Sequence, residues 1–205
     1  VLDRYGIEEI KPGDMFLSND PFVGKGSHLP DVAILAPVFR DGEVVLFVSN
    51  IAHHSDIGGM APGSMAGGMT EIYQEGLRIP PIRIVQDDKI LQDIFDLVLL
   101  NVRVPSERRG DYMAQIAANR LGNRRLTELF KKWSKEQMKL GCSAIIDAVT
   151  RRMRSSIAEL PDGNYGFEDI LDDDGMGTEN IPVVVNIVKQ GEEIWLDFSG
   201  SGPCL

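Results

Sequence analysis

Histidine, cysteine and aromatic residues are scarce in this sequence, and long apolar runs are absent. The 205 residues include three histidines and two cysteines, and 7% are aromatic. Two cysteines, Cys142 and Cys204, do not make a disulfide framework of the kind that small secreted domains use. No apolar run reaches the roughly 18 residues of a membrane span, and Val1–Arg4 lacks a signal-peptide pattern. We therefore expect a cytoplasmic protein that does not cross a membrane.

Basic residues are outnumbered by acidic ones. Lys and Arg total 21 against 31 Asp and Glu, which gives a formal net charge of -10. Such a chain repels nucleic acid and anionic membranes on average, so neither is an expected partner. The basic residues between positions 124 and 152 are expected to form a solvated helix face. Hydrophobic residues reach 43%, which is enough for a sizeable core.

The three histidines, His28, His53 and His54, all lie between residues 18 and 68. This stretch begins with Ser18-Asn19-Asp20-Pro21 and ends with a glycine-rich segment over residues 58–68. That segment is too short for a linker between domains and is expected to be a site-forming loop, with a flexible surface loop as the alternative.

Two apolar runs between the histidines are expected to form a β-hairpin. Asp31–Phe39 and Glu43–Ala52 are strand-like, and Arg40-Asp41-Gly42 has turn chemistry. An antiparallel pair places Asp31 beside His53, so His28, Asp31 and one of His53 or His54 can converge. Two imidazoles and a carboxylate are suitable ligands for a catalytic divalent metal. The alternative is that the histidines have only a hydrogen-bonding role. Because adjacent strand residues point to opposite faces, only one of His53 and His54 is expected to bind the metal.

The remaining segments predict an α+β fold in three regions. A β-hairpin-rich region over 1–87 is followed by a central helical block of two or three helices over 88–160, and a second β region with a C-terminal β-hairpin over 161–205. In the first region, Leu77–Val85 contains Pro80-Pro81 and is not expected to be a central strand. The final hairpin is expected to pair Ile181–Lys189 with Glu193–Phe198.

Several common cofactor motifs are excluded. The Gly24-Lys25-Gly26 segment lacks the Ser or Thr of a phosphate loop, and a dinucleotide-binding loop requires a glycine where Leu29 stands. The run Asp172-Asp173-Asp174-Gly175 is expected to be an acidic turn, because a calcium-loop register places Ile170 at its first ligand position. The sequence therefore contains no ATP-binding motif.

Four long strings resemble the hydantoinase B family, which includes the acetone carboxylase alpha subunit and the C-terminal half of oxoprolinase. They are GDMFLSNDPFVGKGSHLPDVAILAPVF, SNIAHHSDIGGMAPGSMAGG, EIYQEGLRIPPIRI and NVRVPSERRGDYMAQIAANRLGNRRL. The resemblance covers essentially the whole chain, including LDDDGMG and IWLDFSGSG near its end. Family members are considerably longer, so we expect the 205 residues to be one hydantoinase B-type domain fragment from the N-terminal part of such a protein.

The resemblance implies a set of site residues. A metal would be held by His28, Asp31 and His53, with manganese or zinc as the expected ion and iron as an alternative. His54, Asp56 and Asp20 are the candidate catalytic residues that the resemblance implies. Asn19 and Glu75 are the candidate substrate-binding residues.

The resemblance also implies an activity and a partner. The expected function is the metal-dependent catalytic subunit of an ATP-dependent cyclic amide hydrolase of the hydantoin, N-methylhydantoin or oxoproline type. A hydantoinase A-type subunit would use ATP to phosphorylate the substrate, and ATP would not bind to this chain. Ketone carboxylation in the manner of acetone carboxylase is the alternative within the family. A non-catalytic scaffold subunit and a non-haem iron oxygenase are the alternatives outside it.

Overall fold

The fold is α+β, as expected, in a computed structural model that describes residues 1–203. Cys204 lies outside the described residues. The chain divides into two compact units, Val1–Lys135 and Glu136–Leu205, and each is described by itself. The expected division of one domain at residues 87 and 160 stays a prediction.

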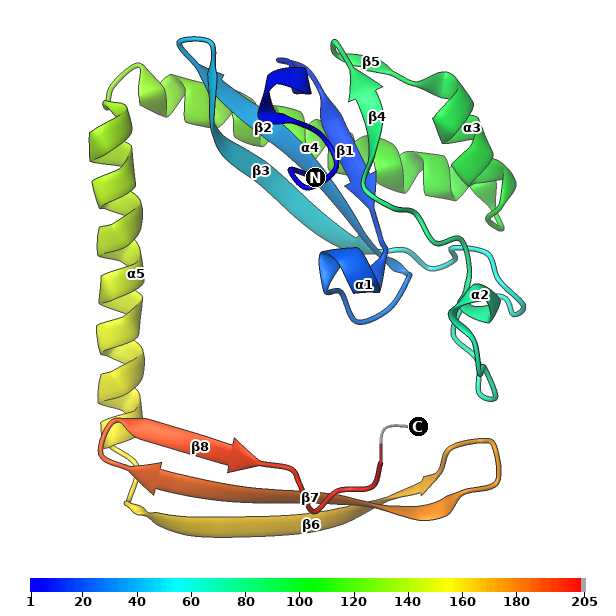
Figure 1. Ribbon diagram of the computed structural model, residues 1–205, viewed down its shortest axis with the longest axis vertical. Helices are drawn as coiled ribbons and strands as arrows, with labels where there is room; N and C mark the ends of the chain where they lie inside the picture. The colour runs from blue at the N-terminus through cyan, green and yellow to red at the C-terminus, as the bar shows by residue number, and fades with distance from the viewer. Residues whose placement is uncertain (204–205) are drawn as a thin grey trace. The chain divides into compact units, whose positions relative to one another are not determined.

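The first unit contains an antiparallel five-stranded sheet in the order β3-β2-β1-β4-β5 (Figure 1). Its strands are β1 (Met15–Ser18), β2 (Asp31–Arg40), β3 (Glu43–His53), β4 (Ile82–Gln86) and β5 (Lys89–Ile90). The predicted hairpin is confirmed as β2 and β3, whose ends meet where Asp31 pairs with His53.

Two boundaries between residues 77 and 92 differ from the expectation. The strand β4 begins at Ile82, directly after Pro80-Pro81, so the two prolines lie outside the sheet. Because β4 lies between β1 and β5, the prediction that this segment is not a central strand is wrong. Asp87 and Asp88 both take positive φ angles in a tight turn that produces the short strand β5. The helix expected from Asp88 consequently begins at Gln92.

Three longer helices occupy the expected helical block, α3 (Gln92–Leu100), α4 (Pro105–Phe130) and α5 (Lys135–Ala158). The 3-10 helix η1 (Ile7–Glu9) precedes β1, and the short helices α1 (Pro21–Gly24) and α2 (Ile72–Glu75) follow β1 and the glycine-rich segment, respectively. Pro105 occupies the first turn of α4, where its missing N–H is not needed. Helix α4 then continues through Gly110 and Gly122 without a break.

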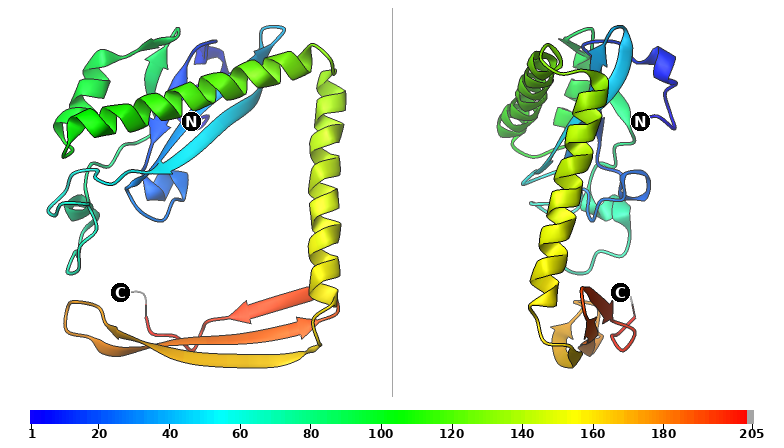
Figure 2. Two further views of the ribbon diagram at one scale, coloured as in Figure 1. Left: turned by 180° about the vertical axis from the view of Figure 1, so that it is seen from behind. Right: turned by 90° about the vertical axis from the view of Figure 1, so that its left-hand side faces the viewer.

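Helix α4 covers one face of the sheet (Figure 2). Tyr112 and Ile116 of α4 are buried in the same core as Val32 and Ile34 of β2. Leu121 of the same helix is 45% exposed.

A stripe of carboxamides along α4 also contacts the sheet. Gln115, Asn119 and Asn123, spaced four residues apart, donate hydrogen bonds to the carbonyls of Val32, Ile34 and Pro37, respectively. The polar stripe satisfies backbone groups that are otherwise buried beneath the helix.

The second unit is α5 followed by a three-stranded antiparallel sheet, β6 (Gly163–Asp173), β7 (Glu179–Gln190) and β8 (Glu193–Asp197). The expected C-terminal hairpin is confirmed as β7 and β8. Of the expected acidic turn, Asp172 and Asp173 are the last residues of β6, and Asp174 and Gly175 begin the connection to β7, where Asp174 accepts bonds from the amides of Met176 and Thr178. Ile145 and Met153 of α5 are 67% and 60% exposed.

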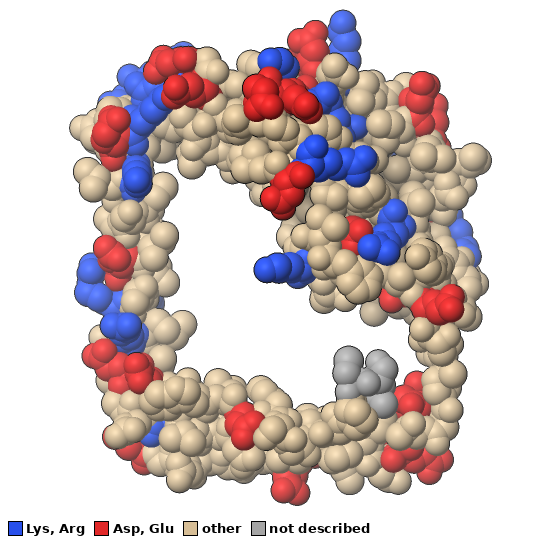
Figure 3. All heavy atoms as spheres, in the orientation of Figure 1, with Lys and Arg blue, Asp and Glu red and all other residues tan. Residues whose placement is uncertain are grey.

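Basic and acidic side chains are interspersed where α4 meets α5 (Figure 3). Arg125 pairs with Glu128, and Lys135 pairs with Glu43. This mixture agrees with the expected solvated face. Within residues 1–203, no helix combines the length and the apolar character that crossing a bilayer requires.

Candidate metal centre

The side chains of His28, Asp31 and His53 converge at the open end of the β2–β3 hairpin. His28 Nε2 lies 3.0 Å from His53 Nδ1 and 3.1 Å from Asp31 Oδ1, and His53 Nδ1 lies 3.2 Å from the same Asp31 oxygen. Asp31 and His53 are cross-strand partners, so their side chains project from the same face of the sheet. His28 reaches them from the loop before β2.

The ligand atoms have the spacing that a single divalent ion requires. Ligand atoms bound at about 2.1 Å and at right angles to each other are about 3.0 Å apart. One carboxylate oxygen and two imidazole nitrogens form a donor set that zinc, manganese and iron accept. The three residues therefore fit the metal that the family resemblance implies.

Access and orientation also favour ligation. The side chains of His28, Asp31 and His53 are 32%, 28% and 51% exposed, so an ion and a substrate can reach them. Ser27 Oγ lies 3.3 Å from His28 Nδ1, and a proton on Nδ1 that is donated to this hydroxyl leaves the Nε2 lone pair facing the cluster. Such an orienting partner is a regular feature of histidine ligands.

A cavity of about 420 Å³ opens beside His28, lined by Ser27, His28, Ser64, Met65, Ala66, Met69 and Glu75. Glu75, predicted to bind substrate, is thus brought next to the candidate metal ligands. A second cavity of about 420 Å³ borders Asp31 and includes Asn19 and Asp20 among its lining residues. The triad therefore lies between two cavities, both formed by residues of the first unit.

His54 lies on the opposite face of the sheet from His53 and is 1% exposed. Its Nε2 is 2.9 Å from Gln115 Oε1 of α4, and its ring packs 4.4 Å from that of Tyr112. Burial lowers the pKa of His54, although the Gln115 hydrogen bond opposes this shift. These contacts anchor the strand end to α4, and the catalytic role of His54 stays a prediction.

Asp56 organises the glycine-rich loop. It accepts hydrogen bonds from the amides of Gly58, Gly63 and Arg103 and pairs with the Arg103 guanidinium at 3.0 Å. Burial raises the pKa of Asp56, but these hydrogen bonds outweigh it and hold the pKa below 3.8. Arg103 also donates to the carbonyls of Gly59 and Ala61. These bonds hold residues 58–63 of the glycine-rich segment in place. The site-forming role of the segment and the catalytic role of Asp56 stay predictions.

Asn19 and Asp20 join the loops around the triad. Asn19 donates to the carbonyls of Leu29 and Leu77 and accepts from the Ile79 amide. Asp20 caps α1 and pairs with Arg78 at 2.9 Å. Burial by itself raises the pKa of Asp20. The hydrogen bonds from Arg78 and the Phe22 amide lower it by more than burial raises it, so the pKa lies below 3.8. Their predicted roles in catalysis and substrate binding are not tested by these contacts.

Ser27, Arg103 and Gln115 were not among the residues singled out from the sequence. Ser27 directly precedes His28, and this adjacency was the one signal that pointed to an orienting role. Arg103 and Gln115 lie 47 and 61 positions after Asp56 and His54, respectively. Contacts over such sequence separations become visible only in the folded chain.

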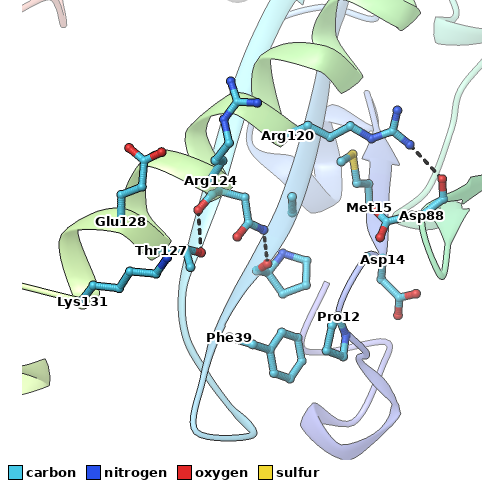
Figure 4. A pocket seen from close by; sticks show the side chains of 14 residues that line it. Pro12, Asp14, Met15, Phe39, Asp88, Arg120, Arg124, Thr127, Glu128 and Lys131 are labelled. Atoms are coloured by element: carbon cyan, nitrogen blue, oxygen red, sulfur yellow. Dashed lines mark hydrogen bonds between the residues drawn. The ribbon is translucent and has the colours of Figure 1, made fainter.

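A further pocket of about 670 Å³ lies toward the turn end of the hairpin, away from the triad (Figure 4). Its charges are mixed, with Arg120, Arg124 and Lys131 offset by Asp14, Asp88 and Glu128. Arg120 is bound to the carbonyl oxygen of Asp88 at 2.8 Å. The His28, Asp31 and His53 cluster is the one set of three or more metal-ligating side chains among residues 1–203.

Comparisons with known proteins place these features in a family context. A family model described as hydantoinase B/oxoprolinase matches residues 1–205. The beta subunit of caprolactamase from Pseudomonas jessenii is 34% identical over 91% of this chain and 32% of its own length. The crystal structure of that ATP-dependent caprolactamase superposes with a TM-score of 0.83 at 33% identity, over 95% of this chain and 33% of the matched chain.

Two further relatives carry different names. A 5-oxoprolinase from Dictyostelium discoideum is 31% identical over 97% of this chain and 16% of its own length. The delta subunit of acetophenone carboxylase from Aromatoleum aromaticum is 27% identical over 99% of this chain and 30% of its own length. The chain thus spans a third or less of each curated relative.

Proposed function

The chain belongs to the hydantoinase B/oxoprolinase family, and on that basis we propose that it is part of the metal-dependent catalytic subunit of an ATP-dependent cyclic amide hydrolase. The observation that carries this proposal is the convergence of His28, Asp31 and His53 within 3.0 to 3.2 Å. Relatives named caprolactamase and 5-oxoprolinase support a cyclic amide as the substrate.

The metal would be manganese or zinc, with iron as an alternative, held by His28 Nε2, Asp31 Oδ1 and His53 Nδ1. When bound, a divalent ion supplies Lewis acidity that polarises a substrate carbonyl or lowers the pKa of water. Ser27 would orient His28, and the Asp31 carboxylate would supply the negative charge in the set. The Asp56–Arg103 pair would hold the glycine-rich loop beside these ligands.

The proposed partner is a hydantoinase A-type subunit that uses ATP to phosphorylate the carbonyl oxygen of the substrate. This chain would act on the phosphorylated intermediate, which accounts for the lack of an ATP motif in its sequence. Relatives named as beta and delta subunits support a hetero-oligomer. The cytoplasmic location stays a prediction.

Ketone carboxylation is the second candidate function, because one relative is named as a subunit of acetophenone carboxylase. The same three ligands would serve both reactions. A non-catalytic scaffold would need no metal, so metal dependence separates it from both enzymes.

Removal of the metal is expected to abolish ATP-dependent ring opening by the full-length protein assembled with its partner. The assay follows ring-opened product from a hydantoin, 5-oxoproline and caprolactam before and after treatment with a chelator. Activity is expected to return on addition of manganese or zinc, as the Lewis-acid role requires. Undiminished turnover by metal-free protein would contradict the proposal, and ATP-dependent ketone carboxylation without ring opening would favour the second candidate.

A further inference from the structure

The cavity beside His28 has one apolar wall. Met65 and Ala66 of the glycine-rich segment and Met69, which directly follows it, line this wall, and Met65 is 63% exposed. Methionine side chains are flexible and polarisable, so they adapt to apolar groups of different shape. A wall of this kind suits the methylene groups of a small ring.

Some polar side chains of the same cavity already have hydrogen-bond partners within the protein, and one does not. The Ser64 hydroxyl accepts from the Ile57 amide and donates to the Gly58 carbonyl, each at 2.8 Å. Ser27 faces His28 and Asp31. Among the described residues, the Glu75 carboxylate has no hydrogen-bond or ion-pair partner. Glu75 is therefore the acceptor that remains available to a ligand.

The position of Glu75 relative to the metal ligands is fixed by close backbone packing. The Met60 amide donates to the Gln74 carbonyl and the Leu77 amide to the Ile57 carbonyl, each at 2.8 Å. A Cβ on Gly59, whose φ is +82, would lie 2.5 Å from the Glu75 carbonyl oxygen. Only glycine permits this approach. The end of α2, which carries Glu75, is thereby held against the segment that follows His53 and His54 (Figure 1).

We propose that the Glu75 carboxylate accepts a hydrogen bond from the ring N–H of a cyclic amide whose carbonyl faces His28, Asp31 and His53. In this arrangement Met65 and Met69 contact the ring methylenes. The inference rests on the proposed function and narrows it to substrates that carry a free N–H. Binding is weakened when a ligand removes water from a hydrogen-bond acceptor and donates no hydrogen bond in return. A ketone or an N-alkylated amide leaves Glu75 in that state, so the cavity discriminates against both.

The test compares caprolactam with N-methylcaprolactam in the full-length protein assembled with its partner. The wild type is expected to favour the N–H compound by about 10- to 100-fold in kcat/KM, because a hydrogen bond to a charged acceptor is lost on methylation. In Glu75→Ala this preference is expected to fall to about 1, because no acceptor remains. Glu75→Gln keeps an acceptor oxygen and is expected to retain part of the preference.

Two further readouts and a control variant separate this inference from the proposed function. Calorimetric titration of both lactams without ATP is expected to show the same loss of preference in Glu75→Ala. Metal content is expected to be unchanged in that variant. Glu9→Gln, an exposed glutamate of η1, is the matched control and is expected to behave as the wild type.

An undiminished N–H preference in Glu75→Ala, in turnover and in binding, would overturn the assignment of Glu75. Loss of the metal in that variant would also overturn it, because Glu75 would then act on the metal centre. If the wild type opens neither lactam, the proposed function fails. The role of Glu75 is then still decided by calorimetry, which compares how strongly the wild type and Glu75→Ala prefer caprolactam over N-methylcaprolactam in binding.

Discussion

Asp31→Ala in the full-length protein is expected to lose the bound metal and about 100-fold or more of the ring-opening activity. Asp31 supplies the one negative charge among the three candidate ligands, and the two neutral imidazoles that remain do not offset a divalent cation. Lewis-acid stabilisation is worth several kcal/mol, and each 1.36 kcal/mol corresponds to a factor of ten in rate. Elemental analysis and steady-state kinetics of the assembled protein measure both losses.

Two variants bracket this result. Asp41→Asn, at the turn end of the same hairpin, is expected to keep both metal and activity, because the Asp41 side chain is 77% exposed and its one ion-pair partner among residues 1–203 is Arg40. His54→Ala is expected to keep the metal while lowering the free energy of unfolding by about 2 to 4 kcal/mol, since a buried ring is removed. A His54→Ala protein without metal, beside a His53→Ala protein that retains it, would show that the wrong histidine is assigned.

Asp56→Ala is expected to lower the free energy of unfolding by about 2 to 3 kcal/mol. The substitution leaves the amides of Gly58 and Gly63 without their acceptor and the Arg103 guanidinium without its carboxylate. This loss is at the low end of what removing one partner of a buried ion pair costs, because the Arg103 side chain is 40% exposed. The glycine-rich loop then loses its fixed position, so turnover is expected to fall while His28, Asp31 and His53 keep their metal.

The same carboxylate sets a pH dependence. Because the pKa of Asp56 in the folded protein is below 3.8, its contribution to stability is complete above that value and disappears as the pH falls through the folded pKa. Urea unfolding measures the free energy of unfolding at neutral pH and below pH 3.8. The decrease in this free energy between the two pH values is expected to be smaller for Asp56→Asn than for the wild type. Identical acid sensitivity of the two proteins would contradict the role assigned to Asp56.

The β2–β3 hairpin and the convergence of His28 with Asp31 were predictable because both depend on local sequence. Two apolar runs joined by a tight turn predict adjacent antiparallel strands, which brings Asp31 close to His53. The direct pairing of these two residues also depends on a register shift between Val38 and Phe39, which the sequence did not reveal. Side chains alternate between the two faces of a strand. The same alternation predicts that His54 points to the other face. The expectation for residues 77–91 was partly wrong, because the turn at Asp87 and Asp88 needs positive φ angles that the helical pattern did not reveal.

The parts that the sequence did not reveal depend on contacts between distant segments. The side chains of Asp56 and Asn19 join loops through bonds to Arg103 and Ile79, while their predicted functional roles stay predictions. A polar residue next to a ligand motif has the same appearance in sequence whether it contacts substrate or backbone. The carboxamide stripe of α4 was missed for a related reason, since hydrophobic periodicity does not register polar side chains that bind buried carbonyls.

The most direct test of the metal centre is an anomalous-scattering measurement on crystals of the full-length protein loaded with manganese or zinc. The predicted result is a single strong peak about 2.0 to 2.2 Å from His28 Nε2, Asp31 Oδ1 and His53 Nδ1. A peak elsewhere in the molecule, or none in a protein that opens cyclic amides, would contradict it.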